Sequence, residues 1–332
     1  MKTEFDLINW LRSESRIKNL KSKVRLGIGD DCAVIRQNSK FDLVITTDLL
    51  IEEIDFRLAW TTPEFIGHKA LAISLSDVAA MGAKPIWALV SIGVPERVWR
   101  SDFVERFYQG WFQLSKKFGV ELAGGDVSRT PDKIVIDSIV AGEAKKNCAV
   151  LRSGARVGDQ IFVTGELGGA AAGLELLENG LRIETANDSQ SKLLRRQLCP
   201  TPQIKIAEFL GRQKMATAMI DLSDGLSSDL AHLCAASKLG ARIIAEKIPV
   251  DKNLLNKDLD SATTKKAINL ALNGGEDFEL LFTVKPHNVK KLKSKLKNSI
   301  TWIGEMSGDT DKIELISSTG RHELSAKGFR HF

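Results

Sequence analysis

Residues 217–245 of the chain read TAMIDLSDGLSSDLAHLCAASKLGARIIA. The apolar run at 217–220 predicts a strand, the apolar spacing over 226–237 predicts a helix, and 241–245 predicts another strand. The loop between the first strand and the helix contains Asp221, Ser223, Asp224 and Gly225. This order of elements predicts an α/β fold in which polar side chains gather where a strand ends.

Strands and helices alternate in both halves of the chain. Further strands are expected at 42–47, 86–94, 121–123, 133–142, 160–164, 278–284 and 299–303. Helices are expected at 4–13, 63–81, 98–118, 169–177, 202–210 and 289–296. The segment 142–158 is polar, basic and contains glycine, so we expect two mixed α/β domains, residues 1–145 and 146–332. Helical connections without an evident tight hairpin predict some parallel strand pairing.

Composition restricts the class of protein. The 332 residues are 43% hydrophobic and 27% charged, which is typical of a globular protein of about two domains. The longest nearly uncharged stretch, 86–95, is about half the length of a membrane span. The start of the chain is acidic and lacks an apolar segment, which argues against a secretory signal. Four cysteines without CxxC spacing fit a reducing compartment, so a cytoplasmic protein without membrane contact is expected.

The charge of the chain does not by itself indicate a nucleic-acid partner, because a net charge of +5 is mild. The densest basic stretch is 285–297, where lysines alternate with Val289, Leu292 and Leu296 at helical spacing. This pattern favours a solvated helix face over a surface that binds a phosphate backbone.

Aspartate beside glycine or a hydroxyl residue recurs near the ends of predicted strands. The five motifs are Gly29-Asp30-Asp31, Thr46-Thr47-Asp48, Gly124-Gly125-Asp126, Asp221-Leu-Ser223-Asp224-Gly225 and Gly274-Gly275-Glu276-Asp277. Ser76-Asp77 adds an acid inside a predicted helix. Converging carboxylates repel unless a cation lies between them, and Mg²⁺ prefers carboxylate, hydroxyl and phosphate oxygens. Glycine lets backbone N–H groups approach phosphate. Each motif alone is more often a turn, but together they predict Mg-nucleotide chemistry.

Several of these residues also have simpler explanations. Ser223 or Asp224 could cap the helix that follows, although a cap leaves Asp221 unexplained. Asp77 fits either a helix surface or a partly buried acid that needs a partner. Arg152, in the interdomain segment, fits an exposed arginine and a phosphate contact equally well. The sequence has no Walker phosphate loop, protein-kinase signature or GxGxxG dinucleotide motif, so a nucleotide site of those classes is excluded.

Eight segments, spread in order over nearly the whole chain, together resemble the thiamine-monophosphate kinase family. They read GIGDDCAV (27–34), TTD (46–48), LSDVAAMGA (75–83), GGD (124–126), LRSGA (151–155), IDLSDG (220–225), NGGED (273–277) and GFRHF (328–332). Each segment is weak alone, but eight in register are specific. The family is part of an ATP-binding superfamily that includes aminoimidazole ribonucleotide synthetase, selenophosphate synthetase and a hydrogenase-maturation dehydratase.

The resemblance implies both a fold and a reaction. The fold has two α/β domains of the aminoimidazole ribonucleotide synthetase type, in a homodimer whose N-terminal sheets form a shared barrel. The reaction is transfer of the γ-phosphate of ATP to thiamine monophosphate, which gives thiamine diphosphate and ADP with several Mg²⁺ ions. The acceptor oxygen is already ionised near pH 7, so direct in-line transfer needs no general base. None of the five histidines falls in an acidic motif, which fits this mechanism.

The matched motifs also imply site residues. Those that resemble magnesium ligands are Asp31, Thr46, Thr47, Asp48, Asp77, Asp126, Asp221 and Asp224. Those that resemble ATP contacts are Tyr108, Gly125, Asp126, Arg152 and Ser223. On the thiamine side the matches are Asp55, Glu276 and Phe329. Asp55 departs from the family, some members of which carry histidine there, and Phe329 either stacks on a heterocycle or anchors the C-terminus.

Two other functions stay open from the sequence. The first is another enzyme of the superfamily, although Cys32 is embedded in an acidic motif and the last five residues contain no reactive cysteine. The second is a basic nucleic-acid-binding module led by 285–297, which predicts strongly salt-dependent binding and no ATP turnover. A function in nucleic-acid binding would not explain the acidic motifs.

Overall fold

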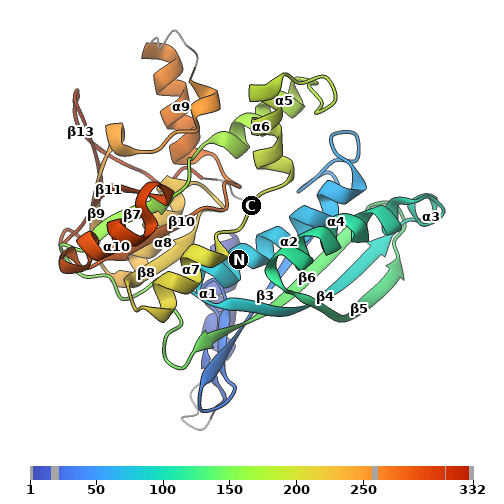
Figure 1. The fold of residues 1–332 in the computed structure, drawn as a ribbon, viewed down its shortest axis with the longest axis horizontal. Coiled ribbons are helices and arrows are strands. Elements are labelled where there is room, and N and C mark those ends of the chain that lie inside the picture. The colour runs from blue at the N-terminus through green and yellow to red at the C-terminus, as the bar shows by residue number, and fades with distance from the viewer. Residues whose placement is uncertain (1–2, 16–21, 256–260, 311, 329–332) are drawn as a thin grey trace.

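Two mixed β-sheets, one in each half of the chain, organise the fold. The structure is a computed structural model that describes residues 3–15, 22–255, 261–310 and 312–328. The first sheet has the strand order β1-β2-β3-β6-β4-β5 and lies at the lower right of Figure 1. Its strands are β1 (Val24–Leu26), β2 (Ala33–Arg36), β3 (Phe41–Ile51), β4 (Lys84–Val94), β5 (Glu121–Arg129) and β6 (Val135–Lys145).

Helices cover one face of the first sheet (Figure 1). Strands β4 and β5 pair in parallel through a helical crossover, and α2 packs against α4 and against β3 and β6. Helices α2 and α4 approach closely, because a Cβ at Gly67 or Gly110 would lie 1.9 Å from a backbone oxygen of the other helix. Only glycine fits at such a crossing. The helices of this half are α1 (Glu4–Ser15), α2 (Pro63–Ala80), α3 (Glu96–Trp99) and α4 (Phe103–Phe118).

The second sheet has the strand order β13-β12-β9-β11-β7-β10-β8, in which β9 and β12 pair in parallel. Its strands are β7 (Gln160–Thr164), β8 (Ala216–Asp221), β9 (Gly240–Ile244), β10 (Leu280–Val284), β11 (Ile300–Ser307), β12 (Ile313–Ser317) and β13 (Gly320–Glu323). The helices of this half are α5 (Gly169–Glu178), α6 (Asp188–Leu198), α7 (Ile204–Arg212), α8 (Leu226–Ser237), α9 (Ser261–Asn273) and α10 (Val289–Leu296). Short 3₁₀ turns are η1 (Ala245–Lys247), η2 (Lys252–Leu254), η3 (Pro286–Asn288) and η4 (Lys297–Ser299).

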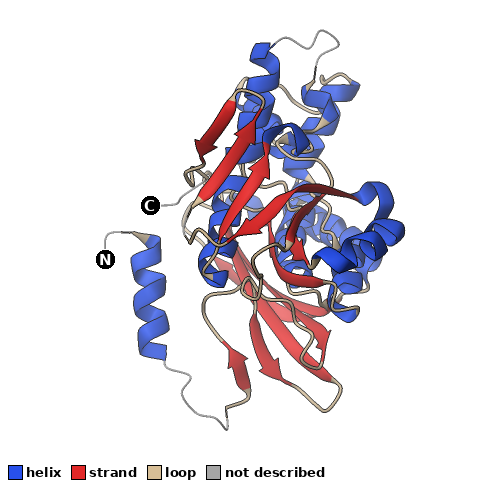
Figure 2. Ribbon diagram, turned by 90° about the vertical axis from the view of Figure 1, so that its left-hand side faces the viewer, coloured by secondary structure: helices blue, strands red, loops and turns tan. Residues whose placement is uncertain are grey.

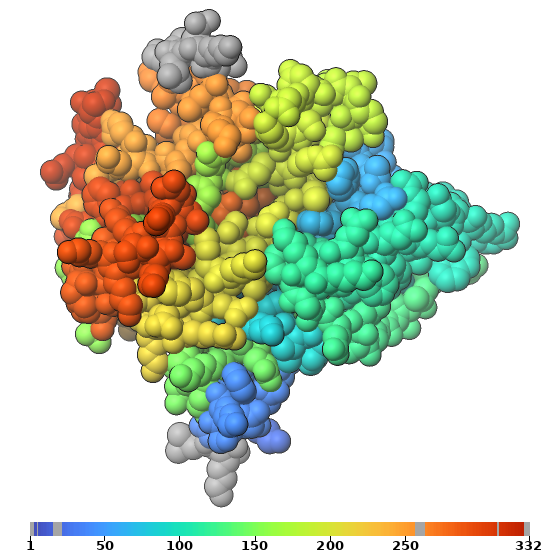
Figure 3. All heavy atoms as spheres, viewed as in Figure 1, coloured from blue at the N-terminus to red at the C-terminus, as the bar shows by residue number. Residues whose placement is uncertain are grey.

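Helix α2 connects the two halves. Leu71, Leu75 and Val78 on this helix are fully buried, and the helix packs against α7 and β8 of the second half. The larger hydrophobic core therefore continues into the second half, where the rings of Phe162 and Phe282 stack with centroids 5.8 Å apart. In the space-filling view the two halves meet along a continuous boundary (Figure 3). Lys69, Ser74 and Ser76 of α2 are consequently buried, although they are polar.

Two helices expose much of their surface. Helix α1 stands apart from the two domains at the left of Figure 2, and its Trp10 is 49% exposed. Helix α10 buries Leu292 and exposes its lysines, as a solvated helix face predicts. Within the described ranges, no helix is long and apolar enough to cross a bilayer.

Most predicted elements are confirmed, and two predictions are wrong. The strand at 160–164 and the helices at 226–237 and 289–296 are found with the predicted bounds. The single helix predicted at 98–118 is instead α3 and α4, because the Ser101 hydroxyl donates to the Val98 carbonyl and accepts the N–H of Phe103. The prediction of connections without a tight hairpin is also wrong, because β12 and β13 form one. Ser317 and Gly320 are the paired residues next to its turn, which lacks the usual Asn-Gly or Asp-Gly signal.

Candidate active site

Three aspartates from three different elements meet in the interior. Asp31 lies in the loop before β2, Asp77 lies in α2, and Asp221 ends β8. One carboxylate oxygen from each residue lies within 4.8 Å of the other two, which is close enough for one metal ion. We call this group the acidic triad. All three residues were predicted as magnesium ligands. Of the two explanations for Asp77, the partly buried acid with a partner is confirmed, because its carboxylate accepts a hydrogen bond from Thr46.

Burial and mutual repulsion disfavour the ionised carboxylates of this region. Burial raises the pKa of Asp221 to about 7, and repulsion from Asp31 contributes to the rise. Burial also raises the pKa of Asp77 well above its usual range, with further repulsion from Asp48, Asp221 and Asp31. The pKa of Asp48 is raised to about 6, chiefly by burial, although a hydrogen bond from Ser74 opposes the rise. A bound cation would stabilise all of these carboxylates in their ionised form.

Arg152 lies beside the triad. Its Nε donates to Asp31 Oδ1 at 3.1 Å, and its backbone N–H donates to Asp30 at 3.2 Å. The Arg152 side chain is only 27% exposed, so the explanation as an ordinary surface arginine is wrong, whereas the phosphate contact stays a prediction. The second oxygen of Asp31, Oδ2, is buried and has no hydrogen-bond partner within the part of the chain that the structure describes. Burial and the charge of Asp31 raise the pKa of Asp30 to about 7.

Strand β3 presents its three predicted ligands to both faces of the first sheet. Thr46 Oγ1 donates to Asp77 Oδ2 at 2.5 Å, and Asp48 is hydrogen-bonded to the same helix. Thr47 Oγ1 instead donates to Asp137 of β6 at 2.6 Å, on the opposite face, because successive side chains of a strand alternate. The structure thus brings Thr46 and Asp48, but not Thr47, next to the acidic triad.

The other predicted residues of the first half do not reach the triad within one chain. Gly125 and Asp126 lie inside the exposed edge strand β5 rather than at a strand end. A Cβ at Gly125 would lie 1.8 Å from a carbonyl oxygen of β4, so glycine is required there. Tyr108 lies on α4, where its ring packs edge-to-face on Phe107 at 5.2 Å. The roles of these residues toward ATP and magnesium stay predictions.

Ser223 and Asp224 lie in the loop that joins β8 to α8. The N-cap of α8 is Gly225, and the N–H groups of Asp224 and Gly225 donate to Asp229 Oδ2 at 3.2 and 3.1 Å. The explanation that Ser223 or Asp224 is the N-cap of the helix is therefore wrong, because Gly225 occupies that position. Both residues instead line a large cavity.

This cavity has a volume of about 640 Å³ and is lined by both halves of the chain. Its acidic part contains Asp48 and Asp224. Its apolar walls are formed by residues that include Ile54, Phe56, Trp60, Phe65, Leu174, Leu177 and Phe278. A second part presents charged side chains, Asp55, Arg57, Lys69 and Glu276. The volume and the mixture of apolar walls with a few charged groups are typical of a site for a small organic ligand.

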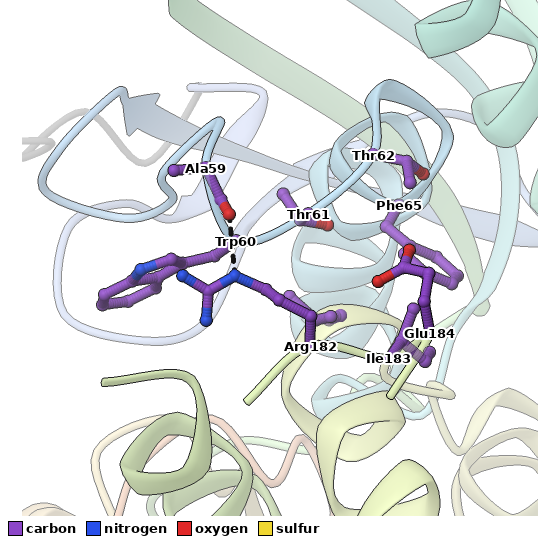
Figure 4. A pocket seen from close by; sticks show the side chains of 9 residues that line it. Ala59, Trp60, Thr61, Thr62, Phe65, Arg182, Ile183 and Glu184 are labelled. Atoms are coloured by element: carbon purple, nitrogen blue, oxygen red, sulfur yellow. Dashed lines mark hydrogen bonds between the residues drawn. The ribbon is translucent and has the colours of Figure 1, made fainter. Parts of the chain in front are cut away.

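A smaller pocket of about 160 Å³ adjoins this cavity and shares four lining residues with it, Trp60, Thr61, Phe65 and Leu198. Figure 4 shows Arg182 of the second half at this pocket, where its Nε donates to the carbonyl oxygen of Ala59 at 2.8 Å. This hydrogen bond connects the loop around Ala59, in the first half, to the second half of the chain.

Of the three residues predicted on the thiamine side, the structure describes Asp55 and Glu276 but not Phe329. Asp55 lines the large cavity, and its Oδ2 also accepts the backbone N–H of Ile51, at the end of β3, at 2.7 Å. Glu276 lines the same cavity. Phe329 lies outside the described residues, but the preceding residues Lys327 and Gly328 line the cavity, so the chain reaches the site shortly before Phe329.

Lys69 and Gln197 are among the residues of this cavity that the sequence analysis did not identify. Lys69 is 5% exposed within the apolar helix α2, and a charge inside an apolar helical run was the available signal. Gln197 lies near the end of α6, which was not predicted, although Asn187 and Gln190 form a capping box that marks its start. Because neither residue stands beside a glycine or a second acid, the motif search did not select them.

Comparisons with known proteins agree with this geometry. Residues 29–144 match the family model of the AIR synthase related protein, N-terminal domain, and residues 156–316 match that of the C-terminal domain. The thiamine-monophosphate kinase of Buchnera aphidicola subsp. Acyrthosiphon pisum (strain APS) is 38% identical over 333 residues, which cover 99% of each chain. The chain belongs to the thiamine-monophosphate kinase family.

Further relatives cover the whole chain as well. The thiamine-monophosphate kinase of Escherichia coli (strain K12) is 37% identical over 99% of this chain and 98% of its own. The solved complex of AaThiL with AMPPCP and TMP has a TM-score of 0.83 and 34% identity, and covers 99% of this chain and 97% of its own. The predicted α/β fold with two mixed-sheet domains is confirmed. Membership of the thiamine-monophosphate kinase family excludes another enzyme of the superfamily and a nucleic-acid-binding module as the primary function.

Proposed function

We propose that the chain transfers the γ-phosphate of ATP to the phosphate of thiamine monophosphate, which gives thiamine diphosphate and ADP. One observation carries the proposal: in a chain of this family, an acidic triad lies beside a cavity of about 640 Å³ that has both apolar and charged walls. The relatives are thiamine-monophosphate kinases, and one solved relative holds AMPPCP and TMP, which supports this choice of substrates.

The donor set of the triad fits magnesium. Mg²⁺ is bound through carboxylate, hydroxyl and phosphate oxygens, and the triad supplies three carboxylates within 4.8 Å. One of their oxygens, Oδ2 of Asp31, is buried and without a hydrogen-bond partner among the residues described. We propose that several Mg²⁺ ions bind here, with Thr46 and Asp48 beside the triad and Asp224 toward the cavity. Magnesium at such a site neutralises the negative charge of the two reacting phosphates.

The residues of the chain then have to bind and orient two anions. The acceptor is a phosphate oxygen that is ionised near pH 7, so no side chain has to remove a proton. Arg152, which is fixed by Asp31, is proposed to contact an ATP phosphate, and Ser223 and Gly125 are proposed to contact the nucleotide. The acceptor oxygen attacks the γ-phosphorus as the bond to the β,γ-bridging oxygen breaks, directly and without a phosphoenzyme. Alignment of the two substrates supplies much of the rate enhancement.

The part of the cavity away from the triad is proposed to bind the thiamine rings. Glu276 is proposed to pair with the cationic thiazolium ring, and Asp55 lies in the same wall. Phe329 is proposed to stack on a heterocycle, which is consistent with the position of Gly328 in the lining. The apolar walls match the flat, poorly hydrated rings of such a substrate.

We also propose that the chain works in the cytoplasm as a homodimer whose N-terminal sheets form a shared barrel. Leu49, on the face of β3 that also carries Thr47, is 56% exposed, and the edge strand β5 is exposed over most of its length. Exposed apolar surface on a sheet with a free edge is commonly covered by a partner. Light scattering should give about twice the chain mass of 36.5 kDa, and a monomer would contradict the proposal.

A product assay tests the reaction. Purified protein with Mg-ATP and thiamine monophosphate should form thiamine diphosphate, and ADP should appear in equal amount. Thiamine is the matched control, because its hydroxyl group would need a general base that the acidic motifs do not supply. Absence of thiamine diphosphate, or phosphorylation of thiamine at a comparable rate, would contradict the proposal.

A further inference from the structure

The carboxylate of Glu276 is held through both of its oxygens. Oε1 lies 2.7 Å from Lys69 Nζ, and Oε2 accepts a hydrogen bond from Gln197 Nε2. The Lys69 side chain is 6% exposed and Gln197 is 5% exposed, whereas the Glu276 side chain is 33% exposed. Two buried groups from different helices, α2 and α6, therefore fix one carboxylate that remains accessible from the cavity.

The backbone that carries Glu276 is fixed as well. Glu276 has a φ of +65°, which residues other than glycine rarely adopt. Its N–H donates to the Ser223 carbonyl at 2.7 Å, and a Cβ at Gly275 would lie 2.5 Å from that same oxygen. The next residue, Asp277, accepts the N–H of Gly168 at 2.6 Å, at the start of α5. Such strained conformations persist only where the surroundings hold them, and they concentrate at functional sites.

Lys69 lies on the part of α2 that lines the cavity, about two turns away from the acidic triad. It shares with Ile66 and Ile73 the side of α2 that lines the cavity. Asp77 of the triad is eight residues further on, which corresponds to about 12 Å along the helix axis. The ammonium group also lies 3.5 Å from the carbonyl oxygen of Asp55, which lines the same cavity. The ammonium group of Lys69 is therefore held by Glu276 and by the loop around Asp55.

We propose that Lys69 and Gln197 are positioning residues that hold the Glu276 carboxylate ready for the cationic ring of the acceptor substrate. The inference rests on the proposed function, in which Glu276 pairs with the thiazolium ring. A carboxylate whose orientation is set before binding loses less conformational freedom when the substrate arrives. Lys69 and Gln197 thereby determine how well the enzyme binds its acceptor, and they leave ATP binding unaffected.

Steady-state kinetics with each substrate varied tests this inference. Lys69→Met and Gln197→Met should each raise the KM for thiamine monophosphate about tenfold and leave the KM for ATP within about twofold. Lys69→Met combined with Glu276→Gln should be no worse than Glu276→Gln alone, because residues that act through one group are not additive. The matched control is Lys266→Met, since Lys266 pairs with Glu175 at the same 2.7 Å but with a side chain 64% exposed.

Two results would overturn the inference. If the effects of Lys69→Met and Glu276→Gln multiply in the double variant, Lys69 contacts the substrate itself. If both KM values rise together and the melting temperature falls, the role is structural. If Lys69→Met fails to fold, two other variants test the inference. Lys69→Arg should keep acceptor binding, because it keeps the positive charge, whereas Gln197→Met should weaken it. The opposite pattern would refute the inference. A wild-type chain that forms no thiamine diphosphate contradicts the proposed function instead, and calorimetric binding of thiamine monophosphate to the same variants still tests the positioning residues.

Discussion

Replacement of Asp221 by asparagine should make the metal-free protein more stable and the enzyme inactive. Asp221 is 3% exposed and shares the acidic triad with Asp31 and Asp77. Asparagine keeps the size of the side chain but removes a charge that burial and the neighbouring carboxylates disfavour. The triad is thus expected to destabilise the fold until a cation binds, since residues placed for function often carry such a cost.

The magnitude follows from the pKa of Asp221. A pKa of about 7 in the folded chain, against an ordinary value of 3.8, corresponds to about 4 kcal/mol of lost stability at pH 8. The folded-state pKa is raised, so the neutral acid favours the fold at low pH, and stability is lost as the pH rises from about 4 to about 7. The advantage of Asp221→Asn should therefore be below about 1 kcal/mol at pH 4 and should level off above pH 7.

Denaturant unfolding in EDTA at several pH values measures this difference, and a thermal scan with and without Mg²⁺ measures the effect of the metal. Mg²⁺ should raise the melting temperature of the wild type and leave that of Asp221→Asn nearly unchanged. Asp132→Asn is the matched control, because Asp132 has a side chain 71% exposed and should change stability by less than about 0.5 kcal/mol.

Two outcomes would refute this reasoning. If Asp221→Asn were less stable than the wild type in EDTA at pH 8, the triad would not be a source of electrostatic destabilisation. If Mg²⁺ raised the melting temperature of both proteins equally, Asp221 would not be a magnesium ligand.

Three further predictions concern the same site. Asp48→Ala and Asp126→Ala should each remove most activity at saturating Mg²⁺ while circular dichroism shows an intact fold; near-normal turnover would reject that residue as a ligand. Asp224→Asn should lower kcat more than Ser223→Ala, because water can replace a hydroxyl contact but not a charge, and the reverse order of kcat values would contradict this. Mg²⁺ affinity measured by calorimetry should rise between pH 5.5 and 7.5, because protons compete for Asp48 and Asp221, whose pKa values are about 6 and about 7; a flat profile would be inconsistent with this competition.

Local patterns were sufficient to predict most elements and the composition of the acidic site. The strand at 160–164 and the helix at 226–237 follow directly from apolar spacing. Asp31, Asp77 and Asp221 lie in recurring acidic motifs that predicted Mg-nucleotide chemistry, and the resemblance to the family implied that each is a magnesium ligand. Sequence reasoning missed the helices α6 and α9 and the short strands β1, β2, β12 and β13. The two helices lie in segments rich in polar residues, and the four strands are too short for a clear alternation of apolar and polar residues.

Which residues meet in space could not be predicted from these patterns. Thr46 and Thr47 are neighbours in the chain, yet one contacts Asp77 and the other contacts Asp137 on the opposite face of the sheet. That outcome depends on the register of β3 against α2 and β6, which is set by tertiary packing. Lys69 was missed for a related reason, since its partner Glu276 lies about two hundred residues away along the chain.

A single-turnover experiment with γ-³²P-ATP tests the proposed reaction most directly. With excess enzyme, Mg²⁺ and thiamine monophosphate, the label should move into the terminal phosphate of thiamine diphosphate at the rate at which ATP disappears. No label should remain on the protein, and omission of thiamine monophosphate should stop the loss of ATP. Labelled protein, or release of labelled inorganic phosphate that does not depend on thiamine monophosphate, would contradict direct transfer between the two phosphates.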